Sequence, residues 1–95
     1  MDGQSITQLL RLNKARLFST YPLSSMALFG SYATGTATEA SDVDILVEFN
    51  RPVGFEFIDL SIELEILLQK PVDLVTRQAI KPRLLPYVTR QLHYV

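Results

Sequence analysis

Residues 42–49, Asp-Val-Asp-Ile-Leu-Val-Glu-Phe, alternate between apolar and polar side chains with a period of two. In an extended chain this period separates the side chains onto two faces. One face holds Val43, Ile45, Val47 and Phe49, and the other holds Asp42, Asp44, Leu46 and Glu48. The pattern predicts a strand that packs one face against helices and presents carboxylates at the N-terminal end of the other.

Two further apolar runs predict strands. Residues 25–30 form a short run closed by Gly30, which indicates a buried strand that ends in a turn. Residues 72–76, Val-Asp-Leu-Val-Thr, are too few and too β-branched for a helix.

The helical segments lie between and around these strands. An approximate helical stripe predicts one helix over 4–19, ended by Tyr21-Pro22 because a residue before proline avoids the α region. Residues 55–69 predict an amphipathic helix with its apolar positions at Ile58, Ile62, Ile66 and Leu67. The chain from Pro82 onward is expected to be helical, with a kink or a second short turn at Pro86.

The predicted order is helix, strand, strand, helix, strand, helix. This order indicates an α/β (α+β) fold with a small mixed β-sheet flanked by helices. Residues 1–95 form a single domain, and a composition of 47% hydrophobic and 20% charged residues is that of an ordered chain. Because so short a chain buries only about 60–65% of its unfolded surface, a partner subunit would stabilise it.

Charge and composition exclude several classes of protein. A net charge of −1 argues against a general nucleic-acid binder, so no direct nucleic-acid partner is expected. The chain has no cysteine, no signal-like N-terminus and no apolar run long enough for a bilayer, so we expect a cytoplasmic protein without a membrane partner. Beyond Asp73 every charged residue is basic, which indicates either a solvated helix face or a patch that faces phosphates or a partner. These residues are Arg77, Lys81, Arg83 and Arg90.

Three aspartates are the candidate metal ligands. Asp42 and Asp44 lie on one side of the predicted strand, with Cβ atoms roughly 6–7 Å apart. Alone, they are better explained as two solvated acids at the start of a strand. Asp73 lies inside an apolar strand, where a carboxylate is costly unless something neutralises it. If its strand lies beside the second, three carboxylates converge and could hold one or two Mg²⁺ ions together with substrate phosphates.

A glycine turn precedes these acids. Gly30 permits a positive φ, and successive N–H groups at such a turn can bind an anion, to which the Ser31 hydroxyl can add a donor. Gly35 adds a second flexible point. A glycine-serine pair alone is usually only a turn, so it is the combination with the acids downstream that predicts a site.

Gly30-Ser31, ten intervening residues, Asp42-x-Asp44 and the later Asp73 resemble the DNA polymerase β-like nucleotidyltransferase superfamily. The short length and the segments 70–76 and 80–83 are similar to its minimal nucleotidyltransferase branch, over about residues 26–94. Members of that branch are typically antitoxins encoded beside a HEPN-domain ribonuclease toxin.

The resemblance implies a role for each residue of the motif. Gly30 and Ser31, with Thr34 and Gly35 in the same loop, would bind the nucleotide. Asp42 and Asp44 would hold Mg²⁺, and Asp73 would be the third ligand and the general base. The implied activity is transfer of AMP from ATP to a tyrosine of the HEPN toxin, in a hetero-oligomer of a type VII-like toxin–antitoxin pair.

One residue departs from the family pattern and keeps alternatives open. Thr34 stands where the family often has an arginine that would contact phosphates, and Arg77 or Lys81 are the cations that could replace it. The alternatives are therefore a catalytically weak antitoxin that neutralises its toxin by stoichiometric binding, or a small-molecule nucleotidyltransferase. Small-molecule nucleotidyltransferases generally carry a further domain for the acceptor, and this chain has no room for one.

Several aromatic and apolar residues near the motif need no catalytic role. Tyr32 is expected to pack rather than to stack on a base, and His93 to lie at the surface. The apolar side chains near the C-terminus are candidates for the core or for a partner interface. They are Leu84, Leu85, Tyr87, Val88, Leu92, Tyr94 and Val95.

Overall fold

The computed structural model describes residues 1–95, which form a four-stranded sheet in the order β3-β2-β1-β4. The strands are β1 (Leu23–Phe29), β2 (Val43–Phe49), β3 (Val72–Thr76) and β4 (His93–Tyr94). β1 runs antiparallel to both β2 and β4, whereas β2 and β3 are parallel. The predicted small mixed sheet is confirmed.

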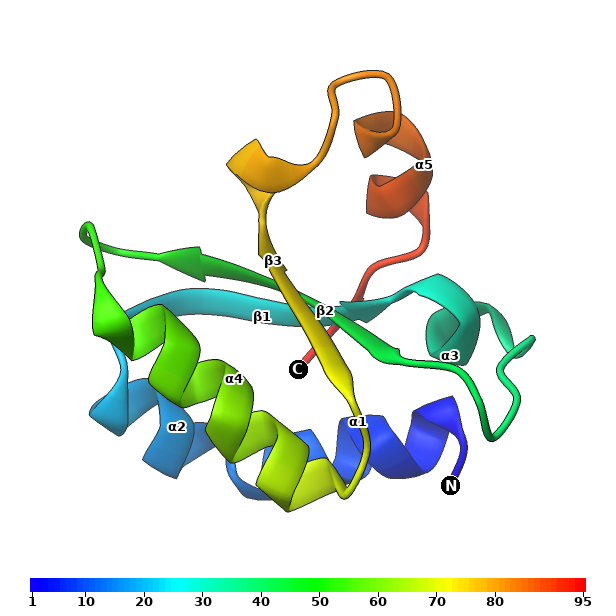
Figure 1. Ribbon diagram of the computed structural model, residues 1–95, viewed down its shortest axis with the longest axis horizontal. Coiled ribbons are helices and arrows are strands. Elements are labelled where there is room, and N and C mark those ends of the chain that lie inside the picture. The colour runs from blue at the N-terminus through cyan, green and yellow to red at the C-terminus, as the bar shows by residue number, and fades with distance from the viewer.

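Helices cover one face of this sheet, and a C-terminal arm lies over the other (Figure 1). The helices are α1 (Gly3–Leu12), α2 (Lys14–Thr20), α3 (Gly30–Thr34), α4 (Phe55–Leu68), the 3-10 helix η1 (Arg77–Ala79) and α5 (Leu85–Arg90). α1, α2 and α4 form the helical layer, while η1 and α5 belong to the arm. None of the helices combines the length and the apolar character needed to cross a bilayer.

The prediction of one helix over 4–19 was wrong, because the chain breaks into two helices at Asn13. The Asn13 side chain donates from Nδ2 to the Leu9 carbonyl oxygen at 2.9 Å, and its ψ of 3° departs from helical values. Asparagine competes for local backbone groups in this way, which favours a helix end over a helix interior.

The core lies between the sheet and the helical layer. The predicted inner face of β2 is confirmed, since Val43, Ile45 and Val47 are fully buried. Each of the three helices adds fully buried side chains to the same cluster. They are Ile6, Leu10, Leu17, Leu60, Leu64 and Leu68.

The apolar face predicted for α4 was wrong. Ile58, Ile62 and Ile66 are 54%, 51% and 67% exposed, and of the predicted positions only Leu67 packs against the core. The residues that face the sheet are Leu60, Leu64 and Leu68. Both sets recur every four residues, so periodicity alone could not choose between them.

The C-terminal segment differs from the expected helix. α5 begins only at Leu85 and places Pro86 in its first turn, where the missing N–H costs little. A short strand, β4, follows it and was not predicted. No residue of α5 is buried, and Leu84, Tyr87 and Tyr94 are about half exposed, so the core role considered for them was wrong.

Candidate active site

Asp44 and Asp73 lie side by side on the sheet face opposite the core. They are register partners in the parallel pair of β2 and β3, and Asp44 also pairs with Phe29 of β1. Registered residues of neighbouring strands project to the same face, so the two carboxylates meet. The condition for convergence of the acids, that the third strand lies beside the second, is met.

The pKa of the Asp44 carboxyl is raised to about 6, first by burial and then by the negative charges of Asp73 and Asp42. A side-chain hydrogen bond with Asp73 adds to the increase. Asp44 is half-buried, whereas Asp73 is exposed on an edge strand. The pair therefore has an excess of negative charge that a cation would relieve.

Asp42 stands outside this pair. It precedes the first residue of β2 and is exposed, although its charge reaches Asp44. The chain holds no group of three or more His, Cys, Asp or Glu side chains placed to share a metal ion. Three converging acids were expected from the sequence, whereas the structure brings together only Asp44 and Asp73.

The donor set nevertheless fits Mg²⁺. Carboxylate oxygens are the hard ligands that this ion prefers, and it is commonly bound through one or two carboxylates plus substrate phosphates rather than in a protein cage. The paired Asp44 and Asp73, with the raised pKa of Asp44, match that requirement.

The glycine turn lies directly against the acids. Gly30 follows β1 with φ of 73°, and a Cβ at this position would collide with the Oδ2 atom of Asp44. Only glycine allows the backbone both this conformation and this approach. The turn continues into α3, which the sequence did not predict, and Gly35 ends that helix in the left-handed region at φ of 78°.

Ser31 and Thr34 both belong to α3, but they differ in exposure and contacts. Ser31 is half-buried beside Gly30, whereas Thr34 is exposed. The Thr34 hydroxyl lies 3.2 Å from the Gly30 carbonyl oxygen and 3.4 Å from that of Ser31, to which it can donate. Thr34 is therefore turned back into its own helix, where it stabilises the turn.

One residue near the turn was missed by sequence reasoning. The Gly30 N–H donates to Oε1 of Gln91 at 3.3 Å, across 61 residues of sequence. Gln91 follows α5 and is half-buried. Nothing in the local sequence marks this glutamine, because only the return of the arm brings it to the turn.

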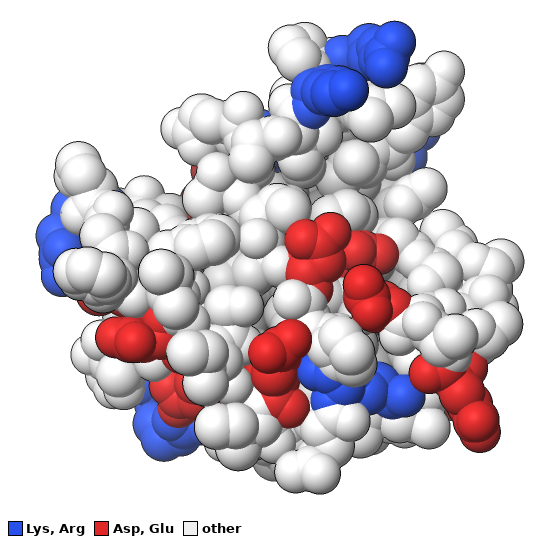
Figure 2. All heavy atoms as spheres, in the orientation of Figure 1, with Lys and Arg blue, Asp and Glu red and all other residues white.

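The basic residues near the C-terminus gather on the arm. Figure 2 shows a group of Lys and Arg side chains at the top of the molecule, above acidic side chains on the same side. Arg77 is paired with Glu48 at 3.1 Å, so it is not free to replace the missing arginine. Lys81 and Arg83 are exposed, and the Arg90 guanidinium lies 5.8 Å from the Tyr87 ring centroid.

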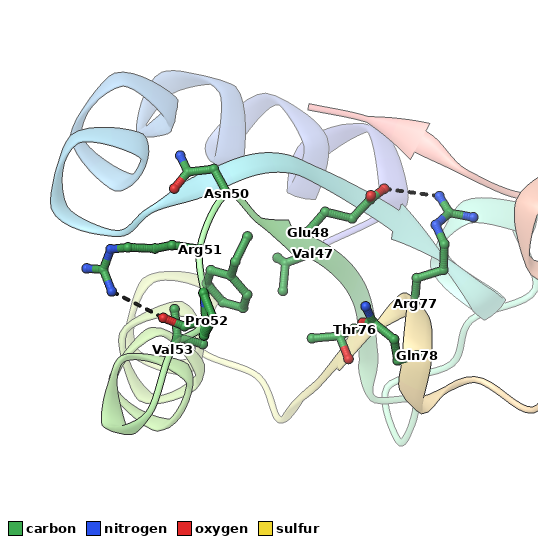
Figure 3. A pocket seen from close by; sticks show the side chains of 10 residues that line it. Val47, Glu48, Asn50, Arg51, Pro52, Val53, Thr76, Arg77 and Gln78 are labelled. Carbon is green, nitrogen blue, oxygen red and sulfur yellow. Dashed lines mark hydrogen bonds and ion pairs between the residues drawn. The ribbon is translucent and has the colours of Figure 1, made fainter.

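A cavity of about 530 Å³ opens at the other end of β2 (Figure 3). Glu48, Arg51 and Arg77 line it, four or more residues beyond Asp44, which corresponds to about 13 Å along a strand. Both guanidinium groups are already paired, Arg77 with Glu48 and Arg51 with Glu56 at 3.0 Å. The cavity is separate from the aspartate pair.

Tyr32 packs in the core and His93 lies at the surface, as expected from the sequence. Tyr32 is 5% exposed within the core, and the Lys70 ammonium lies 5.7 Å from its ring centroid. His93 is exposed on β4.

The chain belongs to the nucleotidyltransferase domain family, whose sequence model matches residues 11–94. It is a nucleotidyltransferase by sequence family and by fold. The protein adenylyltransferase MntA of Thermococcus cleftensis is 39% identical over 93 residues, covering 97% of this chain and 94% of MntA. A protein of Methanocaldococcus jannaschii named as a candidate protein adenylyltransferase is 43% identical over 90 residues, covering 92% of this chain and 87% of its own length.

Solved structures have the same fold. A protein described as a candidate minimal nucleotidyltransferase superposes with a TM-score of 0.75 at 33% identity, over 98% of this chain and 95% of that one. A toxin–antitoxin complex with AMP-PNP gives a TM-score of 0.69 at 29% identity, over 99% and 72%. A tri-AMPylated HEPN toxin of Shewanella oneidensis in complex with its MNT antitoxin gives 0.59 at 27%, over 97% and 66%.

Proposed function

We propose that this chain is the antitoxin of a toxin–antitoxin pair and a Mg²⁺-dependent protein adenylyltransferase that moves AMP from ATP to a tyrosine of a HEPN ribonuclease toxin. The observation that carries the proposal is the pairing of Asp44 with Asp73 directly beside the Gly30 turn. The relatives named as adenylyltransferases and the AMPylated HEPN toxin support the choice of AMP and of acceptor. We place the complex in the cytoplasm, where ATP is available.

The reaction exchanges the phosphoanhydride bond between the α- and β-phosphates of ATP for a phosphoester bond to tyrosine. The tyrosine oxygen attacks the α-phosphorus of ATP, the bond to pyrophosphate breaks, and the tyrosine proton passes to a base. Asp73 suits the role of base because it is exposed on an edge strand, where a protein acceptor can reach it. The attached AMP adds bulk and negative charge to the toxin, which would block its ribonuclease site.

The other residues of the site hold and orient the nucleotide. Asp44 and Asp73 would hold Mg²⁺, which when bound offsets charge on the phosphates, and the charge of the nearby Asp42 would add to the attraction for the ion. Gly30 and Ser31 would bind the triphosphate through backbone N–H groups and the hydroxyl, within the loop closed by Thr34 and Gly35. Because the Gly30 N–H bonds Gln91 here, the nucleotide would have to displace that side chain.

The test is transfer of labelled AMP to the purified HEPN protein encoded beside this chain. Asp44→Asn and Asp73→Asn should each lower the rate by roughly 100-fold or more, because each removes charge at the reacting phosphate. Glu48→Gln is the matched control, since Glu48 lies on the same strand as Asp44 but pairs with Arg77. Full labelling by both aspartate variants would refute the proposal.

A second candidate function is favoured by Thr34. Its hydroxyl is engaged within α3, so the position contributes no cation and no outward donor to a phosphate. A chain that binds ATP poorly could still neutralise its toxin by covering it. In that case inhibition of the ribonuclease persists without ATP and in Asp44→Asn, at a one-to-one ratio of chain to toxin sites.

A further inference from the structure

An apolar stripe runs along the outer face of α4. Its members are Phe55, Ile58, Ile62 and Ile66, which are 81%, 54%, 51% and 67% exposed. They are spaced by three, four and four residues, so they share one side of the helix over about 16 Å. The opposite side of α4 is already buried against the sheet by Leu60, Leu64 and Leu68.

This stripe is not needed for the fold of the chain alone. Contiguous apolar side chains on the outside of a soluble domain mark a surface that another molecule covers. Figure 1 shows α4 on the outer side of the helical layer, where a second helix could lie along it without displacing any element.

The charges beside the stripe select the kind of partner. All ionisable residues of α4 are acidic, and two of them are already neutralised: Glu56 by Arg51, and Glu63 by Arg16 and the Tyr21 hydroxyl. Asp59 and Glu65 remain exposed without a basic partner. A second copy of the chain would bring carboxylates against carboxylates, so the charge favours a partner with lysine or arginine beside its apolar residues.

The C-terminal end of the stripe lies beside the start of β3, the strand that carries Asp73. The Glu65 carboxylate accepts a hydrogen bond from the Val72 N–H at 2.9 Å, and Val72 directly precedes Asp73. The Val43 N–H, one residue before Asp44, donates to the Pro71 carbonyl oxygen at 2.9 Å. A partner lying along α4 past Ile66 therefore reaches the edge where Asp73 is exposed.

We infer that the α4 stripe, flanked by Asp59 and Glu65, is the docking surface for a helix of the acceptor protein that carries an apolar stripe with basic flanks. The identity of the acceptor rests on the proposed function, whereas the surface and its chemistry rest on α4. Docking there holds the acceptor while its tyrosine enters at Asp73.

The experiment measures binding of the HEPN acceptor and AMP transfer with the same variants. Ile62→Asp and the double variant Ile58→Asp/Ile62→Asp should raise the Kd for the acceptor, and its KM, by roughly tenfold or more with kcat little changed. Asp59→Lys/Glu65→Lys should also weaken binding and should reverse its dependence on salt. Leu12→Asp, at a position on α1 that is 83% exposed, is the matched control and should bind as wild type does.

The outcomes separate the two proposals. The isoleucine variants and Leu12→Asp should unfold at the wild-type temperature, because the replaced side chains are exposed. Asp59→Lys/Glu65→Lys loses the hydrogen bond from the Val72 N–H to Glu65 and should unfold at a lower temperature. Binding by Ile62→Asp within twofold of wild type overturns the docking surface and leaves the transferase proposal standing. Loss of binding in Ile62→Asp, with no AMP transferred by the wild type, overturns the transferase proposal and keeps the docking surface. A wild-type chain that does not bind the acceptor overturns both.

Discussion

Single residues decide the electrostatics of the site. Asp44 lies between Phe29 and Asp73 on the sheet face opposite the core, and burial together with two nearby carboxylates raises its pKa to about 6. Gly30 allows the backbone to approach that carboxyl where any Cβ would collide with it. Both effects come from contacts between segments that are distant in the sequence, although both residues were candidates from the sequence.

The raised pKa of Asp44 predicts a pH-dependent stability difference. Since the folded-state pKa lies above the ordinary value of 3.8, the protonated form contributes stability that is full below about pH 4 and lost as the pH rises through about 6. Asp44→Asn, which stays neutral, should therefore be more stable than wild type at about pH 7.5. The expected gain in the free energy of unfolding is only about 1 kcal/mol, because solvent screens the charge of the half-exposed Asp44 carboxylate.

Thermal unfolding of both proteins at about pH 4 and about pH 7.5 checks this prediction. The difference should be much smaller at the lower pH, and a constant difference would contradict the assignment. Added Mg²⁺ should raise the stability of wild type more than that of Asp44→Asn.

Gly30→Ala should cost more than Gly35→Ala. Both positions have positive φ, so each substitution carries roughly 1 kcal/mol of backbone strain. At Gly35 the new Cβ meets nothing within 4 Å, whereas at Gly30 it meets the Asp44 carboxyl. Urea denaturation should show an additional loss of about 1–3 kcal/mol for Gly30→Ala, and equal losses would show that the turn and the acid are not in contact.

Among the secondary-structure elements, α4 shows how a helix can be predicted correctly while its buried face is predicted wrongly. The sequence located the helix to within one residue, since 55–69 was expected and Phe55–Leu68 is observed. Its apolar residues occupy two stripes with the same spacing, and the sheet covers the leucines while the isoleucines remain outside. The choice depends on how the helix is turned against the sheet, which is a property of the packing.

Leu64→Ala and Ile62→Ala test that assignment on one helix. Leu64 is fully buried, so its truncation should lower the free energy of unfolding by about 2–5 kcal/mol. Ile62 is half exposed, so its truncation should change the same quantity by less than about 1 kcal/mol. Denaturation of the isolated chain measures both, and a larger loss at Ile62 would reverse the faces.

At the scale of the whole molecule, the C-terminal arm closes the sheet and reaches the site. β4 pairs with β1 at Ala27 and Leu28, and the Val95 N–H donates to the Met26 carbonyl oxygen at 2.9 Å. Arg11 of α1 adds a hydrogen bond to the Tyr94 carbonyl oxygen at 3.1 Å. The arm thereby connects the helical layer, the edge of the sheet and the Gly30 turn.

Removal of residues 91–95 should therefore destabilise the chain. The truncation leaves the edge of β1 unpaired and removes several hydrogen bonds, each contributing about 1 kcal/mol, so a loss of roughly 2–4 kcal/mol is expected by thermal or urea unfolding. Gln91→Ala removes only the contact with Gly30 and should cost less than about 1.5 kcal/mol. A truncated chain as stable as wild type would show that β4 contributes nothing to the sheet.

The sequence by itself predicted the strand over 42–49, observed as 43–49, the strand over 72–76 and the turn at Gly30, and it singled out the three aspartates, because alternation, β-branching and glycine act locally. The expectation that Asp73 is a costly buried carboxylate was wrong, because Asp73 is exposed on the edge strand β3 and the half-buried carboxyl is that of Asp44. Only the tertiary structure decided that Asp73 pairs with Asp44 while Asp42 stands apart, that Gln91 meets Gly30, and that isoleucines of α4 face outward. These outcomes depend on strand order, register and helix rotation, which contacts between distant segments select and no local pattern encodes.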